Sequence, residues 1–133
     1  MNNQELVKEQ SRFLEMNGFI IPRTEGEAEN VLANLNGYTL LMIGSYKNST
    51  WQNGVVDALK KSEGIIIKPV AVFSDVNNAV VNKVFDYAPS IPRGLNGVAI
   101  FNGSELIEFI KILQLEEQSV SSKILGAILN LEM

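Results

Sequence analysis

Neither cysteine nor histidine occurs in these 133 residues. The absence of cysteine excludes disulfide scaffolds, thiolate zinc sites, thiol nucleophiles and thiol redox couples. The absence of histidine removes the commonest general base and transition-metal ligand, and with it the Ser-His-Asp and Cys-His arrangements. Any remaining chemistry has to use carboxylates, lysine, tyrosine or hydroxyls, and carboxylates favour hard cations such as magnesium.

Long apolar runs and an excess of positive charge are also missing. No apolar run reaches the roughly 20 residues that cross a bilayer, and the amino terminus, MNNQELVKEQ, has no signal-peptide character. We therefore expect a cytoplasmic protein without membrane contact. The formal net charge of −4 argues against a dedicated nucleic-acid binder, because phosphate neutralisation drives such binding. The length and the 46% hydrophobic content predict a single domain over residues 1–133.

The spacing of the apolar residues predicts an α/β fold. Buried strands are expected at GFIIP, IIIKPVAVF and GVAIF, and Pro69 indicates a bulge or an edge strand. Residues 31–35 and 38–43 are predicted to form a hairpin across Asn36-Gly37, because Asn-Gly is the strongest short turn signal. Helices are expected over residues 3–17, 51–62, 105–114 and 120–131.

Residues 75–95 give no clear pattern. The remaining elements follow the order helix, strand, hairpin, helix, strand, loop, strand, helix, helix. Strands that alternate with helices in the second half predict a partly parallel sheet covered by helices.

This order of segments resembles the restriction-endonuclease-like fold of the PD-(D/E)XK superfamily, and within it the nuclease-related domain (NERD) subgroup. The similar segments are ELVKEQSRFLEMNGFII, NVLANLNGYTLLMIGSYK, WQNGVVDALKK, KPVAVFSD and GVAIFNGSELIEFI. The resemblance covers about residues 5–112 and leaves a helix at residues 118–132 as an added element. It implies a mixed central sheet, built from an N-terminal hairpin and parallel strands and flanked by helices.

In that family, two acidic groups hold a magnesium ion that activates water, and a lysine stabilises the developing negative charge. The resemblance places the first acid on Asn30, the second on Ser45 and the lysine on Lys47. Only the lysine of this catalytic signature is retained. The resemblance therefore implies a non-catalytic, nuclease-like module without metal or cofactor, which binds nucleic acid or a protein and has a regulatory role.

Two other functions stay open beside this one. If Glu5, Glu9 or Glu29 replaces the lost ligands, the chain is an active magnesium-dependent nuclease. Alternatively, it is a small acidic immunity or accessory protein, whose negative surface suits a basic protein partner.

Several side chains are candidates for contacts with a partner. Lys47, Gln52, Arg23 and Arg93 are the expected nucleic-acid-binding residues, and Gln52 matches a glutamine that often introduces the family's helix. The apolar face of the C-terminal helix is expected to dock on the core, with a homodimer contact as the alternative.

A thioredoxin-like fold is a further alternative. Trp51 precedes a helix, and the SIPR segment could hold a cis proline. Two features argue against this fold. Cysteine is absent, and FNGSELIEF is predicted to pass directly from strand to helix, where that fold needs another hairpin strand.

Overall fold

A computed structural model of the chain describes residues 3–47, 49–62, 64–112 and 117–132. The helices and strands follow one another along the chain as α1 (Asn3–Met16), α2 (Glu25–Ala33), β1 (Tyr38–Gly44), α3 (Ser49–Lys61), β2 (Ile67–Phe73), α4 (Asn78–Tyr87), β3 (Gly97–Asn102), β4 (Glu105–Lys111) and α5 (Glu117–Asn130).

The four strands form one mixed sheet in the order β2-β1-β3-β4. β1 pairs with β2 in parallel, and α3 connects the two strands, so β1-α3-β2 is a βαβ unit. β3 runs antiparallel to β1 and forms a hairpin with β4 through Gly103-Ser104. The segment before α2 closes the outer side of β2, because Ile20 forms a parallel bridge with Val70.

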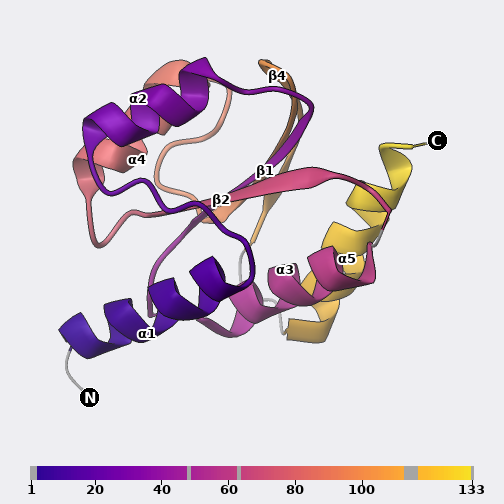
Figure 1. Cartoon of the computed structure of the whole chain (residues 1–133), viewed down its shortest axis with the longest axis horizontal. Coiled ribbons are helices and arrows are strands. Elements are labelled where there is room, and N and C mark those ends of the chain that lie inside the picture. The colour runs from indigo at the N-terminus through magenta and orange to yellow at the C-terminus, as the bar shows by residue number, and fades with distance from the viewer. Residues whose placement is uncertain (1–2, 48, 63, 113–116, 133) are drawn as a thin grey trace.

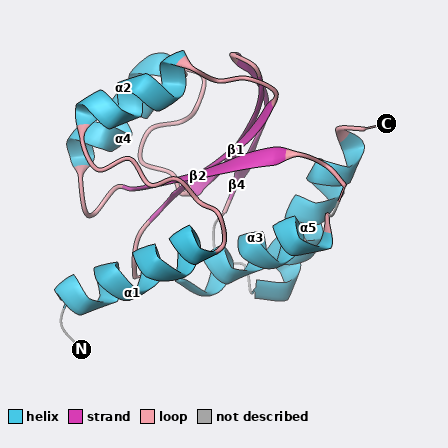
Figure 2. Cartoon of the chain, viewed as in Figure 1, coloured by secondary structure: helices cyan, strands magenta, loops and turns pink. Residues whose placement is uncertain are grey.

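Two layers of helices enclose the sheet (Figure 1). α1, α3 and α5 cover one face, and α2 and α4 cover the other, while the strands lie between them (Figure 2). Successive residues of β1 face opposite layers. Leu40 and Met42 belong to the core beside α1, α3 and α5, whereas Leu41 and Ile43 belong to the core beside α2 and α4. This two-sided burial accounts for the unbroken apolar sequence of β1.

Side-chain caps determine where α2 and α4 begin. The Thr24 hydroxyl accepts a hydrogen bond from the Glu27 amide at 3.1 Å, and the Glu27 carboxylate accepts one from the Arg23 amide at 2.6 Å. The Asn77 side chain caps α4 by accepting a hydrogen bond from the Val80 amide. Each cap provides an acceptor for a backbone donor that the helix itself leaves without a partner.

The general prediction of an α/β fold with a mixed sheet and flanking helices is confirmed. The buried strand expected at GFIIP is reduced to one isolated bridge, from Ile20 to Val70. Two further predicted elements have the wrong type. Residues 31–33 form the end of helix α2 and Asn34 is its C-cap, so no strand forms here and the expected N-terminal hairpin is not found. Residues 105–111 form strand β4 instead of a helix, because the Gly103-Ser104 turn reverses the chain.

The hairpin of β3 and β4 also removes one objection to the thioredoxin-like alternative, since that fold needs a hairpin at this position. The cis proline of that alternative is not found, because no peptide bond in the described part of the chain is cis. None of the described helices is both long and apolar enough to cross a membrane.

Candidate functional site at the ends of β1 and β2

The loops that follow β1 and β2 are joined by hydrogen bonds. Because the two strands are parallel, their carboxyl ends meet at the same edge of the sheet. The Ser45 hydroxyl donates a hydrogen bond to Asp75 Oδ2 at 2.5 Å, and the Tyr46 amide donates one to Asp75 Oδ1 at 3.3 Å. One carboxylate from the second loop therefore holds two successive residues of the first loop.

Two buried glutamines connect the loop after β1 to helices α1 and α3. Gln52 on α3 is fully buried, and its Nε2 donates a hydrogen bond to the Ser45 carbonyl at 2.7 Å. Its Oε1 accepts a hydrogen bond from Nε2 of the buried Gln10 on α1, also at 2.7 Å. Both polar ends of the Gln52 amide thus have partners, as burial requires. This network links α1, α3 and the loop after β1.

Gly44, the last residue of β1, allows α3 to approach this closely. A Cβ atom at this position would lie 2.8 Å from Cζ2 of Trp51 and 2.9 Å from Nε2 of Gln52. Both neighbours are buried. A larger residue would therefore push the first turn of α3 away from the sheet.

A groove runs along α1 beside these loops. It consists of three hollows of about 470, 130 and 560 Å³, all of which have Val7 in their walls. Val76, half exposed at 49%, lines the second and third hollows, and Tyr46 and Asp75 line the third. Ser11 and Arg23 line both the first and the second. Val7 and Val76 thus share the walls of the groove with polar and charged side chains, a mixture that is typical of binding sites.

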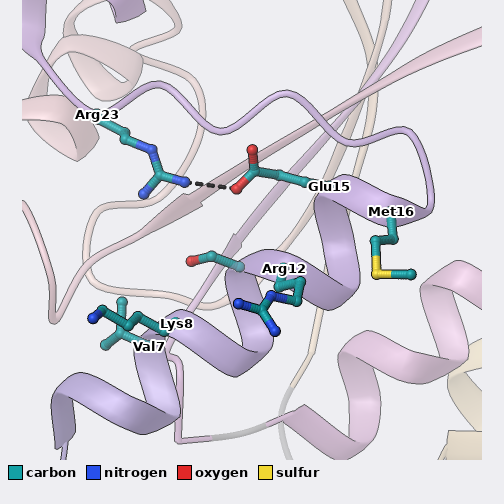
Figure 3. A pocket seen from close by; sticks show the side chains of 7 residues that line it. Val7, Lys8, Arg12, Glu15, Met16 and Arg23 are labelled. Atoms are coloured by element: carbon teal, nitrogen blue, oxygen red, sulfur yellow. Dashed lines mark hydrogen bonds and ion pairs between the residues drawn. The ribbon is translucent and has the colours of Figure 1, made fainter.

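Positive side chains gather on the α1 side of the first hollow (Figure 3). Arg23 reaches across from the segment before α2, and its guanidinium lies 2.6 Å from a carboxylate oxygen of Glu15. Lys8 and Arg12 extend from successive turns of α1. Neither of them has an ion pair with any residue that the structure describes.

The three residues expected at a nuclease-type centre have different roles. Ser45 lies in the network described above. Lys47 is exposed, its Nζ lies 5.7 Å from the ring centroid of Tyr46, and its amide donates a hydrogen bond to Ser45 Oγ at 3.2 Å. Asn30 lies on α2, where its side chain and carbonyl accept hydrogen bonds from Asn34. The structure therefore gives Asn30 a local role within its own helix.

The expected nucleic-acid-binding residues do not share one surface of free donors. Gln52 is buried and uses its amide inside the protein. Arg93 is bound to Asp86 at 2.8 Å and Arg23 to Glu15 at 2.6 Å. Both arginines are therefore occupied by carboxylates of the chain itself.

The carboxylates considered as replacement metal ligands lie on two different helices. Glu5 and Glu9 belong to α1, whereas Glu29 belongs to α2. Glu29 binds Lys83 at 2.6 Å, and this hydrogen bond raises the pKa of Lys83. Within the described part of the chain, no group of three or more acidic side chains is placed to hold a metal ion.

The C-terminal helix has its apolar face turned inward. Val120, Ile124 and Ile128 on α5 are fully buried and belong to the core that α3 and α5 share. The Ser121 hydroxyl donates a hydrogen bond to Asp57 on α3 at 2.5 Å. The expected docking of this helix on the core is confirmed, while Leu129 at its end stays 47% exposed.

Sequence reasoning missed Gln10, Asp75 and the groove residues Val7 and Lys8. Asp75 could have been found, because it follows a predicted buried strand and thus lies at the same sheet edge as Ser45. Gln10 gave no signal, since one glutamine on a polar helix is usually exposed.

A comparison with protein-family models identifies the family of this chain. A family model described as Disulphide isomerase matches residues 2–130, so the chain belongs to that family. No curated protein matches the chain. The family match contradicts the resemblance to a PD-(D/E)XK pseudo-nuclease, whose expected N-terminal hairpin is also replaced by a helix.

Proposed function

We propose that this member of the Disulphide isomerase family binds an extended segment of a partner protein in the groove beside α1 and carries out no thiol chemistry of its own. Thiol–disulfide exchange begins with attack by a thiolate, and these 133 residues contain no cysteine. The proposal keeps the binding and regulatory role expected from the sequence and assigns it to a protein partner.

The position of the groove supports this proposal. In thioredoxin-like proteins, a Cys-x-x-Cys pair is associated with a βαβ unit. Here the loop after β1 includes Ser45, Tyr46 and Lys47, and α3 begins with Ser49 and Thr50. None of these residues carries sulfur. Ser45 and Tyr46 are instead fixed by Asp75, beside the groove. The site has the geometry for binding without the group needed for exchange.

The shape of the groove favours a polypeptide over a compact ligand. From Gln4 to Met16, which both line it, α1 advances about 18 Å. An extended chain rises about 3.3 Å per residue, so the groove accommodates about five residues. Two apolar residues in its walls, Val7 and Val76, suit the side chains of a peptide better than a phosphate backbone.

The binding half of the proposal is tested with an unfolded polypeptide whose cysteines have been blocked by carbamidomethylation, which adds no charge. We expect backbone amide NMR signals of groove residues, Tyr46 and Val76 among them, to shift on addition of this probe. Val76→Asn should weaken binding, because it removes an exposed apolar contact. Ile66→Asn is the matched control, since Ile66 is 89% exposed and lines none of the three hollows.

The chemical half is tested by thiol-dependent reduction of insulin. We expect the rate with dithiothreitol to be the same with and without the protein, because no thiolate is available. Catalysis above the background would overturn the redox-inactive half of the proposal. Unchanged groove signals, or equal loss of binding in both asparagine variants, would overturn the binding half.

A further inference from the structure

We infer that the occupant of this groove is an acidic segment of the partner protein, with carboxylates at alternate positions of an extended chain. This inference rests on the function proposed above and adds the chemical class of the ligand. Lys8 and Arg12 are the residues that recognise it.

The charge of the groove is opposite to that of the whole chain. The formal net charge is −4, yet three cations and one carboxylate line the first hollow: Lys8, Arg12, Arg23 and Glu15. The carboxylate is held by Arg23 at 2.6 Å. Lys8 and Arg12 have no acidic partner among the described residues, so their charges are available to a ligand.

The other carboxylates near α1 define where the ligand's acids can lie. Glu5 and Glu9 line none of the three hollows. Asp75 lines the third hollow, where it accepts hydrogen bonds from the Ser45 hydroxyl and the Tyr46 amide. Lys8 lines this hollow as well as the first, whereas Arg12 lines only the first. Repulsion by Asp75 therefore favours ligand carboxylates on the side of Lys8 that faces Arg12.

The spacing of the two cations fits an extended peptide. Residues four apart on a helix are displaced by about 6 Å along its axis. Alternate residues of a strand are about 6.7 Å apart and point to the same side. Two acidic residues separated by one other residue can therefore meet Lys8 and Arg12 together. The residues between them point the opposite way, toward apolar groove residues such as Val76.

Three acetylated and amidated peptides provide the probes: Gly-Val-Glu-Val-Glu-Val-Gly and its two analogues with glutamine or lysine in place of both glutamates. Binding is measured by NMR titration at low salt. We expect the glutamate peptide to bind about tenfold more tightly than the glutamine peptide, because two exposed ion pairs are gained. Added salt should reduce this difference.

The double variant K8E/R12E should reverse the preference in favour of the lysine peptide. The matched control is K111E/K123E, which changes the net charge by the same amount at two exposed positions on β4 and α5. We expect this control to keep the wild-type preference. Equal loss of binding in both double variants would show a response to net charge only, and would overturn the inference.

The remaining outcomes separate this inference from the function on which it rests. If the three peptides bind equally in the groove, the acidic preference is wrong and the proposed function stands. If no peptide and no unfolded polypeptide shifts the groove signals, both are wrong. If an oligothymidylate of ten nucleotides binds more tightly than the glutamate peptide and K8E/R12E abolishes its binding, the groove binds nucleic acid and the inference is overturned.

Discussion

Asp75 connects to Ser45 across the carboxyl ends of two parallel strands, through a 2.5 Å hydrogen bond between the serine hydroxyl and the aspartate Oδ2. The same carboxylate also accepts the amide hydrogen of Tyr46. Through this pair the loop after β2 controls the conformation of the loop after β1. The wall of the groove therefore depends on a contact between residues 30 positions apart.

Removal of this carboxylate should loosen the first loop. Asp75→Ala is expected to lower the free energy of unfolding by about 1–2 kcal/mol, because two hydrogen bonds to a charged group are lost at a partly exposed position. The Tyr46 amide should exchange faster with solvent. Asp86→Ala, which removes an exposed ion pair with Arg93, should cost less than about 0.5 kcal/mol. Equal exchange of the Tyr46 amide in both variants would contradict the role given to Asp75.

Replacement of glycine by alanine should lower the stability of the protein at Gly44 and raise it at Gly126. Gly44→Ala places a methyl group 2.8 Å from Trp51 and should destabilise the protein by about 1–3 kcal/mol. Gly126 lies in the exposed part of α5, and a Cβ added there would have no other atom within 4 Å. Gly126→Ala should stabilise the protein by about 0.5–1 kcal/mol, because alanine favours the helix. Urea denaturation measures both changes, and a stabilised Gly44 variant would refute the close approach of α3.

Replacement of Thr39 by a less polar residue of the same shape should increase the stability of the protein. It is buried in β1, and its hydroxyl has no hydrogen-bond partner in the described structure. Thr39→Val removes an unsatisfied polar group while it keeps the β-branched shape, so unfolding should require about 1 kcal/mol more. The midpoint of thermal unfolding should rise by about 3–5 °C.

Thr50→Val provides the comparison for this change. Thr50 is exposed at the start of α3, so its hydroxyl is solvated in both the folded and the unfolded chain. We expect the midpoint of thermal unfolding of the Thr50→Val variant to stay close to that of the wild type. A fall in the midpoint for Thr39→Val would mean that its hydroxyl has a partner after all.

The stability that the contact between α3 and α5 provides should depend on pH, because Asp57 in this contact is ionised. A hydrogen bond from Lys61, and a second one from Ser121, lower the pKa of Asp57 below 3.8. The folded state therefore favours the ionised form of Asp57. Its contribution to the stability of the fold is fully present above the ordinary pKa of aspartate, and it is lost as the pH falls through the lowered pKa of Asp57. The difference in stability between the wild type and Asp57→Asn should be largest near neutral pH and shrink below about pH 4.

Urea denaturation at a series of pH values tests this dependence. Ser121→Ala removes one of the two hydrogen bonds, so it should reduce the difference and keep the Lys61 contribution. A difference that stays constant from neutral to strongly acidic pH would exclude the linkage.

An introduced thiol at the start of α3 should be reactive. Cysteine at a helix N-terminus has a lowered pKa, because the helix dipole stabilises the thiolate. Thr50 is exposed in the first turn of α3. We expect the pKa of the thiol in Thr50→Cys to lie about one unit below the usual value of about 8.5. Ser90→Cys, in an exposed turn, should show the usual value when alkylation by iodoacetamide is followed against pH.

The sequence predicted those elements whose apolar pattern is decided by burial. β2 and β3 have two buried faces and read as apolar runs, and α3 and α5 have one buried face with helical spacing. Pro69 predicted a bulge or an edge strand, and the edge is confirmed, since β2 is the last strand in the sheet order. Outside it, Ile20 donates its amide hydrogen to the Pro69 carbonyl at 2.9 Å.

Both errors arose from short apolar runs next to an Asn-Gly pair. At Asn36-Gly37 the Asn-Gly pair suggests a hairpin turn, but the Thr24 side-chain cap begins helix α2, which ends just before this pair. At Asn102-Gly103 the sequence was interpreted as the start of a helix, although the Gly103-Ser104 turn closes a true hairpin. Short apolar segments do not distinguish helix from strand by period alone, so the flanking caps and turns decide.

The sheet has one shielded border and one open border. Ile20 occupies the outer side of β2, whereas β4 has only β3 beside it within the described chain. Glu105, Glu108 and Lys111 on β4 are exposed, and charges on such a border hinder stacking of further chains into fibrils. The charges that protect the sheet against edge-to-edge pairing are thus concentrated in a seven-residue strand at the opposite border from β2.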